Sequence, residues 1–347
     1  MNNQEKPSIL LIYTGGTIGM MRNAETGALE NFNFEHLLRH VPELKQFNLN
    51  ISSQTFDPPI DSSDMRQEHW AKIVEIIYNN YNLFDGFVVL HGTDTMAFTA
   101  SALSFMLEGL NKPVILTGSQ LPIGVLRTDG KENLLTAIEI AAAKNADGTP
   151  IVPEVCIFFN QKLMRGNRCT KISAESFDAF SSNNYPVLAK AGLEIQYDYK
   201  QILPYNPEAR LVPHYELDSD IIIFSLFPGI KPDIIKNVLT NDSLKGIIFR
   251  TFGSGNAPQE EWLVEALTEA TRQGKIIVNI TQCSTGSVKM HLYETGLQLL
   301  ESGIISGADL TVEAALTKLM FLLGKRLPHC EIRSEMRRNI CGELTDN

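Results

Sequence analysis

Seven short apolar runs, each followed at once by glycine or a small polar residue, constrain the fold of this chain most strongly. Uninterrupted apolar runs of this length are typical of strands buried on both faces of a parallel sheet, whereas half-exposed strands alternate apolar and polar residues. The runs read SILLIYTGG, GFVVLHGTD, PVILTGSQ, VCIFFNQ, IIIFSLFPG, GIIFRTFGSGN and KIIVNITQCSTG. The chain is therefore expected to build parallel sheet.

Helical patterns lie between these runs. The segments TMAFTASALSFMLEGL, ENLLTAIEIAAAK and EEWLVEALTEATRQG indicate helices, and the last ends with Arg272 and Gly274, which favour a helix stop. Because strand and helix alternate along the chain, the sequence predicts the α/β class.

A polar stretch divides the chain. Residues 197–213 read YDYKQILPYNPEARLVP, with three prolines and no clear period, as expected of a linker. We expect a larger N-terminal α/β domain with a mostly parallel sheet over residues 1–196. A linker over residues 197–217 then leads to a smaller C-terminal α/β domain over residues 218–347.

Net charge limits the possible partners. The formal net charge of −10 at pH 7 argues against nucleic acid or an anionic membrane, because both favour a basic face. No apolar run approaches the roughly 20 residues of a membrane span. The 44% hydrophobic and 20% charged residues are typical of an ordinary globular protein with a sizeable core.

The N-terminus and the cysteines indicate a cytoplasmic protein. The segment MNNQEKPSILLIY lacks both a cleavage site and an apolar run long enough for a signal peptide, so it is read as a first strand. No C-x-x-C pair occurs, and scattered cysteines of odd number indicate reduced thiols. The cysteines are Cys156, Cys169, Cys283, Cys330 and Cys341.

The candidate functional residues follow the predicted strands. In open α/β sheets, ligands bind beyond the carboxyl ends of the strands. In the N-terminal half, the residues just after these ends are 14–17, 91–95 and 117–120, which are rich in hydroxyl groups and glycine. Turn chemistry and helix caps use the same residue types and are the ordinary alternative for each loop taken alone.

Several other site classes lack their defining residues. TGGTIGM has Thr17 where a dinucleotide fingerprint starting at Gly15 needs glycine, and no lysine follows to complete a P-loop. GSGNAP reaches Pro258 in place of a final glycine, and G-x-S-x-G is absent. His36 and His40 lie four apart without an H-E-x-x-H context, so no metal site is predicted, and His91 is assigned no role.

The hydroxyl groups favour a threonine-based acyl transfer. A neutral hydroxyl is a poor nucleophile and needs a base to take its proton, together with donors for the developing oxyanion. Glycine-flanked loops supply backbone N–H groups, and Lys171 or Asp94 is a candidate base. A lysine must be partly buried to act as a base, and a surface position is the alternative for Lys171.

The motifs YTGGTIGM and HGTDTM together resemble the two signatures of the bacterial-type L-asparaginase family. The resemblance continues in DSSDM, LTGSQLP, RGNRCTKISAESFDAF, FGSGNAPQ and TQCSTGSV, and it covers nearly the whole chain. It is closest to the cytoplasmic, type I branch. The resemblance implies hydrolysis of L-asparagine to L-aspartate and ammonia without a cofactor, by a homodimer or homotetramer with a larger N-terminal and a smaller C-terminal α/β domain.

The resemblance also implies roles for individual residues. Thr17 corresponds to the family nucleophile, which forms an acyl-enzyme, and Thr14 shapes the loop. Thr93, Asp94 and Lys171 correspond to the second catalytic group, in which Asp94 also receives the substrate α-ammonium. The loop that holds the α-carboxylate corresponds to Asp61, Ser62 and Ser63.

One segment departs from the family pattern. The family carries a tyrosine in the loop after TGGT, whereas MMRNAETGALENF contains none and has Ala28 near the expected place. Phe32 could close this loop over a substrate but could not transfer a proton.

The resemblance further points to an allosteric asparagine site, and alternatives to the main function stay open. The matching residues for that site are Thr170, Arg250 and Cys283, for which a structural ion pair and a packed thiol are the alternative. A related amidohydrolase acting on glutamine or another amide is the second enzymatic hypothesis. A non-catalytic amino-acid sensor is the third, although such a sensor would be expected to lack Thr17 or Lys171.

Overall fold

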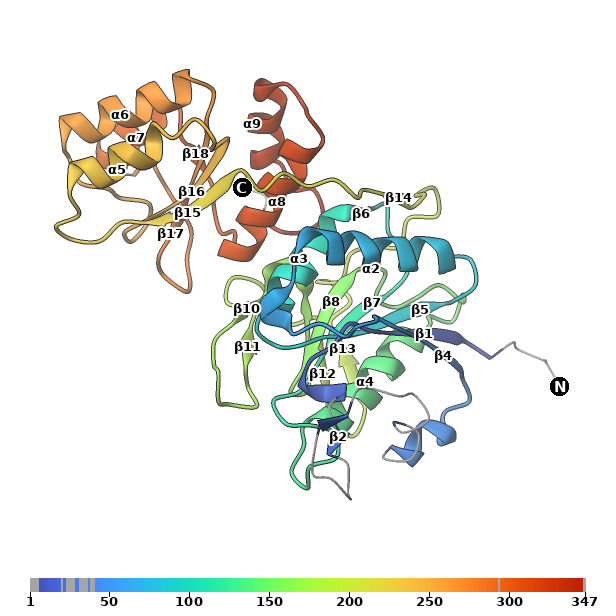
Figure 1. Ribbon diagram of the computed structural model, residues 1–347. Coiled ribbons are helices and arrows are strands. Elements are labelled where there is room, and N and C mark those ends of the chain that lie inside the picture. The colour runs from blue at the N-terminus through green and yellow to red at the C-terminus, as the bar shows by residue number, and fades with distance from the viewer. Residues whose placement is uncertain are drawn as a thin grey trace. The chain divides into compact units, whose positions relative to one another are not determined.

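The computed structural model describes residues 6–19, 21–22, 29–30, 37, 41–292 and 294–345. Contacts between residues divide the chain into two compact units, Met1–Tyr215 and Glu216–Asn347, and each is described here by itself (Figure 1). Both units are layered α/β structures, which confirms the predicted fold class.

The first unit is built on an eight-stranded sheet in the order β13-β12-β9-β8-β7-β5-β1-β4. The five strands from β8 to β4 are parallel, and the strands from β9 to β13 are antiparallel to their neighbours. The bounds are β1 Ser8–Tyr13, β4 Asn50–Thr55, β5 Gly86–Leu90, β7 Val114–Thr117, β8 Val155–Phe159, β9 Lys162–Arg165, β12 Ala189–Ala191 and β13 Ile195–Tyr197.

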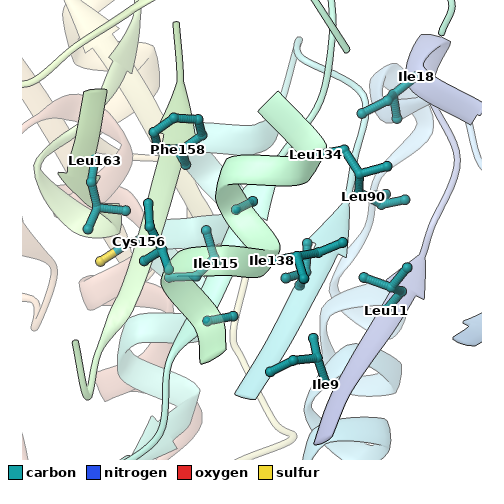
Figure 2. Close-up of a cluster of buried hydrophobic side chains, with 14 of the residues drawn as sticks. Ile9, Leu11, Ile18, Leu90, Ile115, Leu134, Ile138, Cys156, Phe158 and Leu163 are labelled. Carbon is teal, nitrogen blue, oxygen red and sulfur yellow. The ribbon is translucent and has the colours of Figure 1, made fainter. Parts of the chain in front are cut away.

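Helices cover both faces of this sheet. Helices α2 (Gln67–Asn80) and α3 (Met96–Met106) lie on one face, and α4 (Gly130–Ala142) lies on the other (Figure 1). Figure 2 shows the core beneath α4, where side chains from neighbouring strands meet those of the helix. This core includes Ile9, Leu11, Leu90, Ile115, Leu134, Ile138 and Cys156, all fully buried. The apolar runs are continuous because β1, β5, β7 and β8 are covered on both sides.

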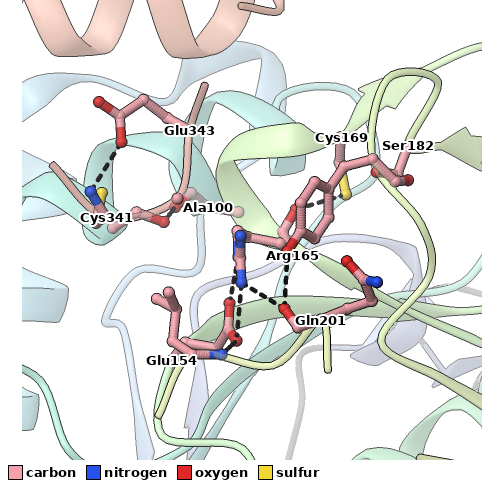
Figure 3. Close-up of polar contacts among 12 residues, drawn as sticks. Ala100, Glu154, Arg165, Cys169, Ser182, Gln201, Cys341 and Glu343 are labelled. Atoms are coloured by element: carbon pink, nitrogen blue, oxygen red, sulfur yellow. Dashed lines mark hydrogen bonds and ion pairs between the residues drawn. The ribbon is translucent and has the colours of Figure 1, made fainter. Parts of the chain in front are cut away.

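The segment expected to be a linker belongs largely to the first unit. Its residues up to Tyr215 fall within that unit, and β14 (Val212–Pro213) pairs with β6 (Leu107–Glu108). A buried ion pair anchors it: Arg165 Nε donates to Glu154 at 2.7 Å, and Arg165 Nη2 donates to the Gln201 carbonyl at 2.7 Å (Figure 3). Leu203 N–H donates to the other Glu154 oxygen at 2.8 Å.

Three short pairs complete the strands of the first unit. They are β2 (Met21–Arg22) with β3 (Leu29–Glu30), β6 with β14, and β10 (Thr170–Lys171) with β11 (Phe180–Ser181). Short 3₁₀ turns lie at Thr17–Gly19 (η1), Pro42–Gln46 (η2), Ser62–Asp64 (η3) and Gly166–Arg168 (η4). Two of these turns, η1 and η3, follow β1 and β4 at the sheet edge discussed below.

The second unit has a parallel four-stranded sheet in the order β15-β16-β17-β18. Its strands are β15 Ile221–Ser225, β16 Gly246–Thr251, β17 Ile276–Thr281 and β18 Ile305–Ser306. Its helices are α5 Pro232–Leu239, α6 Glu261–Arg272, α7 Glu294–Glu301, α8 Val312–Gly324 and α9 His329–Arg337. As the sequence predicts, α6 ends at Arg272, and Gly274 follows with a φ of +97°.

Candidate active site

The predicted site loops gather at one edge of the large sheet. Strands β7, β5, β1 and β4 are parallel neighbours, so their carboxyl ends lie side by side. Loops 14–17 and 91–95 follow β1 and β5 directly, loop 117–120 begins at the last residue of β7, and residues 56–63 follow β4. Four chain segments that are distant in sequence therefore converge at the carboxyl ends of the parallel strands, where α/β sheets bind their ligands.

Glycines allow three of these loops to pack backbone against backbone. Gly15 and Gly16 have φ values of +140° and +88°, which L-residues with a side chain rarely adopt. A Cβ on Gly16 would overlap the backbone of Gly92, and a Cβ on Gly15 would overlap the carbonyl oxygen of Ile60. The TGGT loop therefore touches both the HGTDT loop and the segment after β4.

Thr17 and Thr14 have different surroundings. Thr14 is buried, and its Oγ donates to the Leu90 carbonyl at 3.1 Å, which ties β1 to β5 below the loop. Thr17 begins η1 and is half-buried, immediately after the Gly16 contact with Gly92. Thr14 therefore has a structural position, whereas Thr17 lies where the loops meet.

Tyr13 supports the turn that carries Thr17. Its hydroxyl donates to the Gly16 carbonyl at 3.3 Å, and a Cβ on Gly19 would overlap its ring. Burial raises the pKa of Tyr13 to about 12, so it stays neutral over the physiological range. From the sequence alone, Tyr13 has no predicted role, because it reads as the last residue of an apolar strand.

The segment Asp61–Ser63 forms a capped turn over Gly92. Asp61 caps η3 by accepting from the Ser63 N–H and the Ser63 hydroxyl, both at 2.9 Å. These two hydrogen bonds lower the pKa of Asp61. Ser62 is buried, its side chain lies against Gly92, and its carbonyl accepts from Thr95 Oγ at 2.6 Å.

Thr93, Asp94 and Lys171 form a connected polar group. Lys171 Nζ donates to Thr93 Oγ at 2.9 Å and to Asp94 Oδ1 at 2.6 Å. The Lys171 side chain is 18% exposed, whereas that of Asp94 is 64% exposed. The lysine is thus largely covered, and the carboxylate it contacts remains accessible to a small ligand.

Gln120 also belongs to this group, although the sequence predicts no role for it. Thr93 Oγ donates to Gln120 Oε1 at 3.3 Å, and Gln120 Nε2 donates to the Ser176 carbonyl at 3.0 Å. Asp129 accepts from the Gln120 backbone N–H at 3.0 and 3.1 Å, which fixes the loop. Two features of the sequence could have identified Gln120: its place after β7, next to the end of β5, and its place in the motif LTGSQLP.

The residues predicted for a second site are divided between the two units. Arg250 is the last but one residue of β16 and exposed Cys283 follows β17, both in the second unit, whereas Thr170 precedes Lys171 in β10 of the first unit. Ala28 and Phe32, in the segment where the family tyrosine is missing, lie outside the described residues, as do His36 and His40.

In the described part of the chain, no helix is long and apolar enough to cross a membrane. Among those same residues, no group of three or more His, Cys, Asp or Glu side chains is arranged to hold a metal ion.

Comparisons with known proteins agree along the whole chain. The family model "Asparaginase, N-terminal" matches residues 8–203, and "Glutaminase/Asparaginase C-terminal domain" matches residues 220–336. The sequence is 45% identical over 342 residues to L-asparaginase 1 of Escherichia coli K12, covering 98% of this chain and 99% of that protein.

Solved structures give the same result. L-asparaginase I from Vibrio cholerae matches with a TM-score of 0.89 at 41% identity, covering 98% of this chain and 99% of that one. The thermostable L-asparaginase from Thermococcus kodakarensis matches with a TM-score of 0.88 at 33% identity, covering 98% of this chain and 100% of that one.

Proposed function

Because the chain belongs to the L-asparaginase family, we propose that it hydrolyses L-asparagine to L-aspartate and ammonia with Thr17 as nucleophile. The activity follows from the family. One observation supports the assignment of residues. Thr93 and Asp94, which both accept from Lys171, directly follow Gly92, and Gly92 contacts Gly16, the residue before Thr17. Two threonines, each after its own strand, are thereby brought to one edge of the sheet.

In the first proposed step, Thr17 Oγ attacks the side-chain amide carbon of asparagine. The new O–C bond forms a tetrahedral intermediate, and the amide C–N bond then breaks. The threonine proton ends on the departing nitrogen, which leaves as ammonia and leaves an aspartyl ester on Thr17. Loop N–H groups that follow the glycines are suited to stabilise the oxyanion.

In the second step, water adds to the ester carbon. Its proton returns to Thr17 Oγ as the ester bond breaks and L-aspartate forms. We assign Thr93 to orienting this water, because its hydroxyl is held on two sides, by Lys171 as donor and Gln120 as acceptor. A hydroxyl held in this way loses little further entropy when the reaction occurs.

The substrate α-groups are assigned to the two flanking elements. The carboxylate of Asp94 is suited to the α-ammonium, because it is exposed enough to meet a small ligand and carries the opposite charge. The turn of Ser62 and Ser63 is suited to the α-carboxylate through its hydroxyl and backbone N–H groups. The hydrogen bonds of Asp61 to Ser63 support a role for Asp61 in shaping this turn.

A second site in the C-terminal unit also remains a proposal. Arg250 Nε is buried and has no hydrogen-bond partner among the described residues, and exposed Cys283 lies after the neighbouring strand β17. An unpartnered buried N–H is costly, so an anionic group such as the carboxylate of asparagine would be well accepted there. A hyperbolic saturation curve from an intact oligomer, with no second bound asparagine, would contradict regulation.

Further properties inferred from the family are a cytoplasmic location and a homodimeric or homotetrameric assembly. No nucleic-acid or membrane partner is proposed, in line with the net charge of −10. Sedimentation of the purified protein would give the oligomeric state.

The function is tested by ammonia release from L-asparagine, L-glutamine and their D-forms over a full concentration range. We expect a higher kcat/KM for L-asparagine, because an extra methylene displaces the amide carbon once the α-groups are held. A methylene is typically worth about 1–3 kcal/mol, and misplaced attack adds to it. Equal kcat/KM for both amides would support the broader amidohydrolase alternative. Binding without turnover would support a sensor.

A further inference from the structure

A chain of hydrogen bonds runs beneath the candidate site, through groups that the proposed mechanism does not use. It links Trp70 on α2, Thr99 on α3 and His91 at the end of β5. Trp70 Nε1 donates to Thr99 Oγ at 2.9 Å, Thr99 Oγ contacts His91 Nε2 at 2.9 Å, and His91 Nδ1 contacts the Gly92 carbonyl at 2.6 Å. His91 and Thr99 are fully buried.

Burial and the partners together set the direction of each bond in this chain. A carbonyl oxygen only accepts, so the ring of His91 carries a proton on Nδ1, which is donated to Gly92. Burial lowers the pKa of His91 to about 4, so the ring is neutral at pH 7 and Nε2 carries no proton. Nε2 therefore accepts from the hydroxyl of Thr99, whose oxygen accepts from the donor-only indole of Trp70.

The end of the chain lies at the meeting point of the site loops. Gly92 contacts the backbone of Gly16 on one side and the Ser62 side chain on another, and it is followed by Thr93. The peptide between Gly92 and Thr93 is planar and trans, so fixing its carbonyl direction also fixes the direction of the Thr93 N–H. The orientation of this peptide therefore determines the position of the Thr93 backbone.

We propose that His91 is a positioning residue, which orients the Gly92–Thr93 peptide through a hydrogen-bond chain from Trp70 and Thr99. This inference rests on the role of Thr93 in the proposed function. His91 lies below the loops and is fully buried, so it acts through Gly92 and does not touch the substrate. Thr99 has the further role of satisfying Nε2 of His91, which holds the plane of the ring in the orientation that donates to Gly92.

The chain offers matched variants at two positions. In His91→Asn, the side-chain amide N–H replaces the Nδ1–H donor to Gly92, whereas His91→Gln places its amide nearer the Nε2 position. Thr99→Ser keeps the hydroxyl, and Thr99→Val removes it at nearly constant volume. Because displacement of a reacting group by about 1 Å can cost roughly a hundredfold in rate, we expect losses in kcat of about tenfold to a hundredfold for His91→Gln and Thr99→Val.

The test measures kcat per folded protein for these four variants and for Thr93→Val. We expect Thr99→Ser to retain the wild-type kcat, and His91→Asn to exceed His91→Gln by about tenfold, since only asparagine restores the donor to Gly92. Wild-type kcat in folded Thr99→Val and His91→Gln, with Thr93→Val inactive, would overturn the positioning role alone. Wild-type kcat in Thr93→Val would overturn the role of Thr93 itself.

A second readout does not depend on activity or on whether the His91 variants fold. The ¹⁵N shifts of histidine-labelled wild-type protein distinguish a ring protonated on Nδ1 from one protonated on Nε2. We expect His91 to carry its proton on Nδ1 at pH 7 both in the wild type and in Thr99→Val, because the Gly92 carbonyl can only accept. An Nε2–H ring in the wild type would overturn the proposal.

Discussion

At Lys171, one ammonium group donates to two acceptors of different character, the hydroxyl of Thr93 and the carboxylate of Asp94. The carboxylate holds Nζ in place, and Nζ in turn holds the Thr93 oxygen. The side chain is long and would be freely mobile in solvent, so this contact restricts its rotamers at the site. In our proposal, Lys171 therefore acts both through its charge and through its fixed position between Thr93 and Asp94.

We predict that Lys171→Met leaves the protein folded and lowers kcat by at least roughly a hundredfold, the low end of general acid–base effects. Methionine keeps most of the length and apolar stem but cannot donate to Thr93 or Asp94. Ammonia release at saturating L-asparagine measures the effect.

Lys144→Met is the matched control for this substitution. Lys144 also pairs with a carboxylate, donating to Asp85 at 2.8 Å, but Asp85 immediately precedes β5 and so lies at the other end of that strand. We expect its kcat to match the wild type. Equal rates for the Lys171 and Lys144 variants would remove Lys171 from the mechanism.

At the scale of elements, the loops after β1, β5 and β4 work as one unit because glycine lets them touch. Gly16 combines a φ of +88° with a contact to Gly92 that leaves no room for a Cβ. Gly148 has almost the same φ, +85°, but nothing lies within 4 Å of the position of its Cβ. Alanine at Gly148 therefore introduces backbone strain alone, whereas alanine at Gly16 introduces the same strain and also pushes two loops apart.

We predict that Gly148→Ala lowers the free energy of unfolding by about 1–2 kcal/mol through its left-handed backbone alone and leaves kcat unchanged. Gly16→Ala should cost more and should abolish turnover, because the methyl group displaces Gly92 and with it Thr93. Denaturant unfolding and ammonia release measure the two effects. A Gly16→Ala protein as active as Gly148→Ala would show that the loop contact does not matter for turnover.

Elements buried on both faces could be predicted from the sequence, and edge elements could not. The runs at β1, β5, β7 and β8 were recognised because every residue in them is buried or nearly so. Strand β4 reads NISSQT and is mostly exposed, so its sequence resembles a loop, although it supplies the turn of Asp61–Ser63. The helix predicted through Leu110 ends at Met106, where the chain turns to form β6.

Site residues divide in the same way. Thr17, Thr93, Asp94 and Lys171 were named because their motifs resemble a family, and their roles remain proposals. Gln120 and His91 lie within motifs of the same resemblance, LTGSQLP and HGTDTM, but were given no role. Their contacts depend on strand order and on how α2 and α3 pack over β5, which local sequence does not specify.

For the whole molecule, the pH dependence of stability has one component that can be assigned to His91. Its pKa falls from an ordinary 6.5 to about 4 in the folded protein, mainly because burial disfavours the charged ring. The unfolded chain therefore binds an extra proton between these values. Stability is fully present above pH 6.5 and is lost progressively as the pH falls toward 4.

We predict a loss of about 3 kcal/mol across this window from His91, which corresponds to its shift at about 1.4 kcal/mol per pH unit. Carboxylates with lowered pKa values, such as Asp61, Asp85 and Asp178, act mainly below about pH 5 and overlap only the low end of this window. Denaturant unfolding of the first unit, measured from pH 7.5 to 4.5, gives the slope of its free energy of unfolding against pH. His91→Gln should flatten it, and an unchanged slope in that variant would contradict the assignment.

We propose that Thr17, and not Thr93, forms the acyl bond. Rates cannot separate them, because residues that act as a unit give non-additive losses when either is removed. Trapping does separate them: an aspartyl or diazo-ketone adduct is formed, the protein is digested, and the modified peptide is identified by mass. We predict a single adduct on the peptide that contains Thr17, and none in Thr17→Val. An adduct on Thr93 in the wild-type protein, with Thr17 unmodified, would contradict the account.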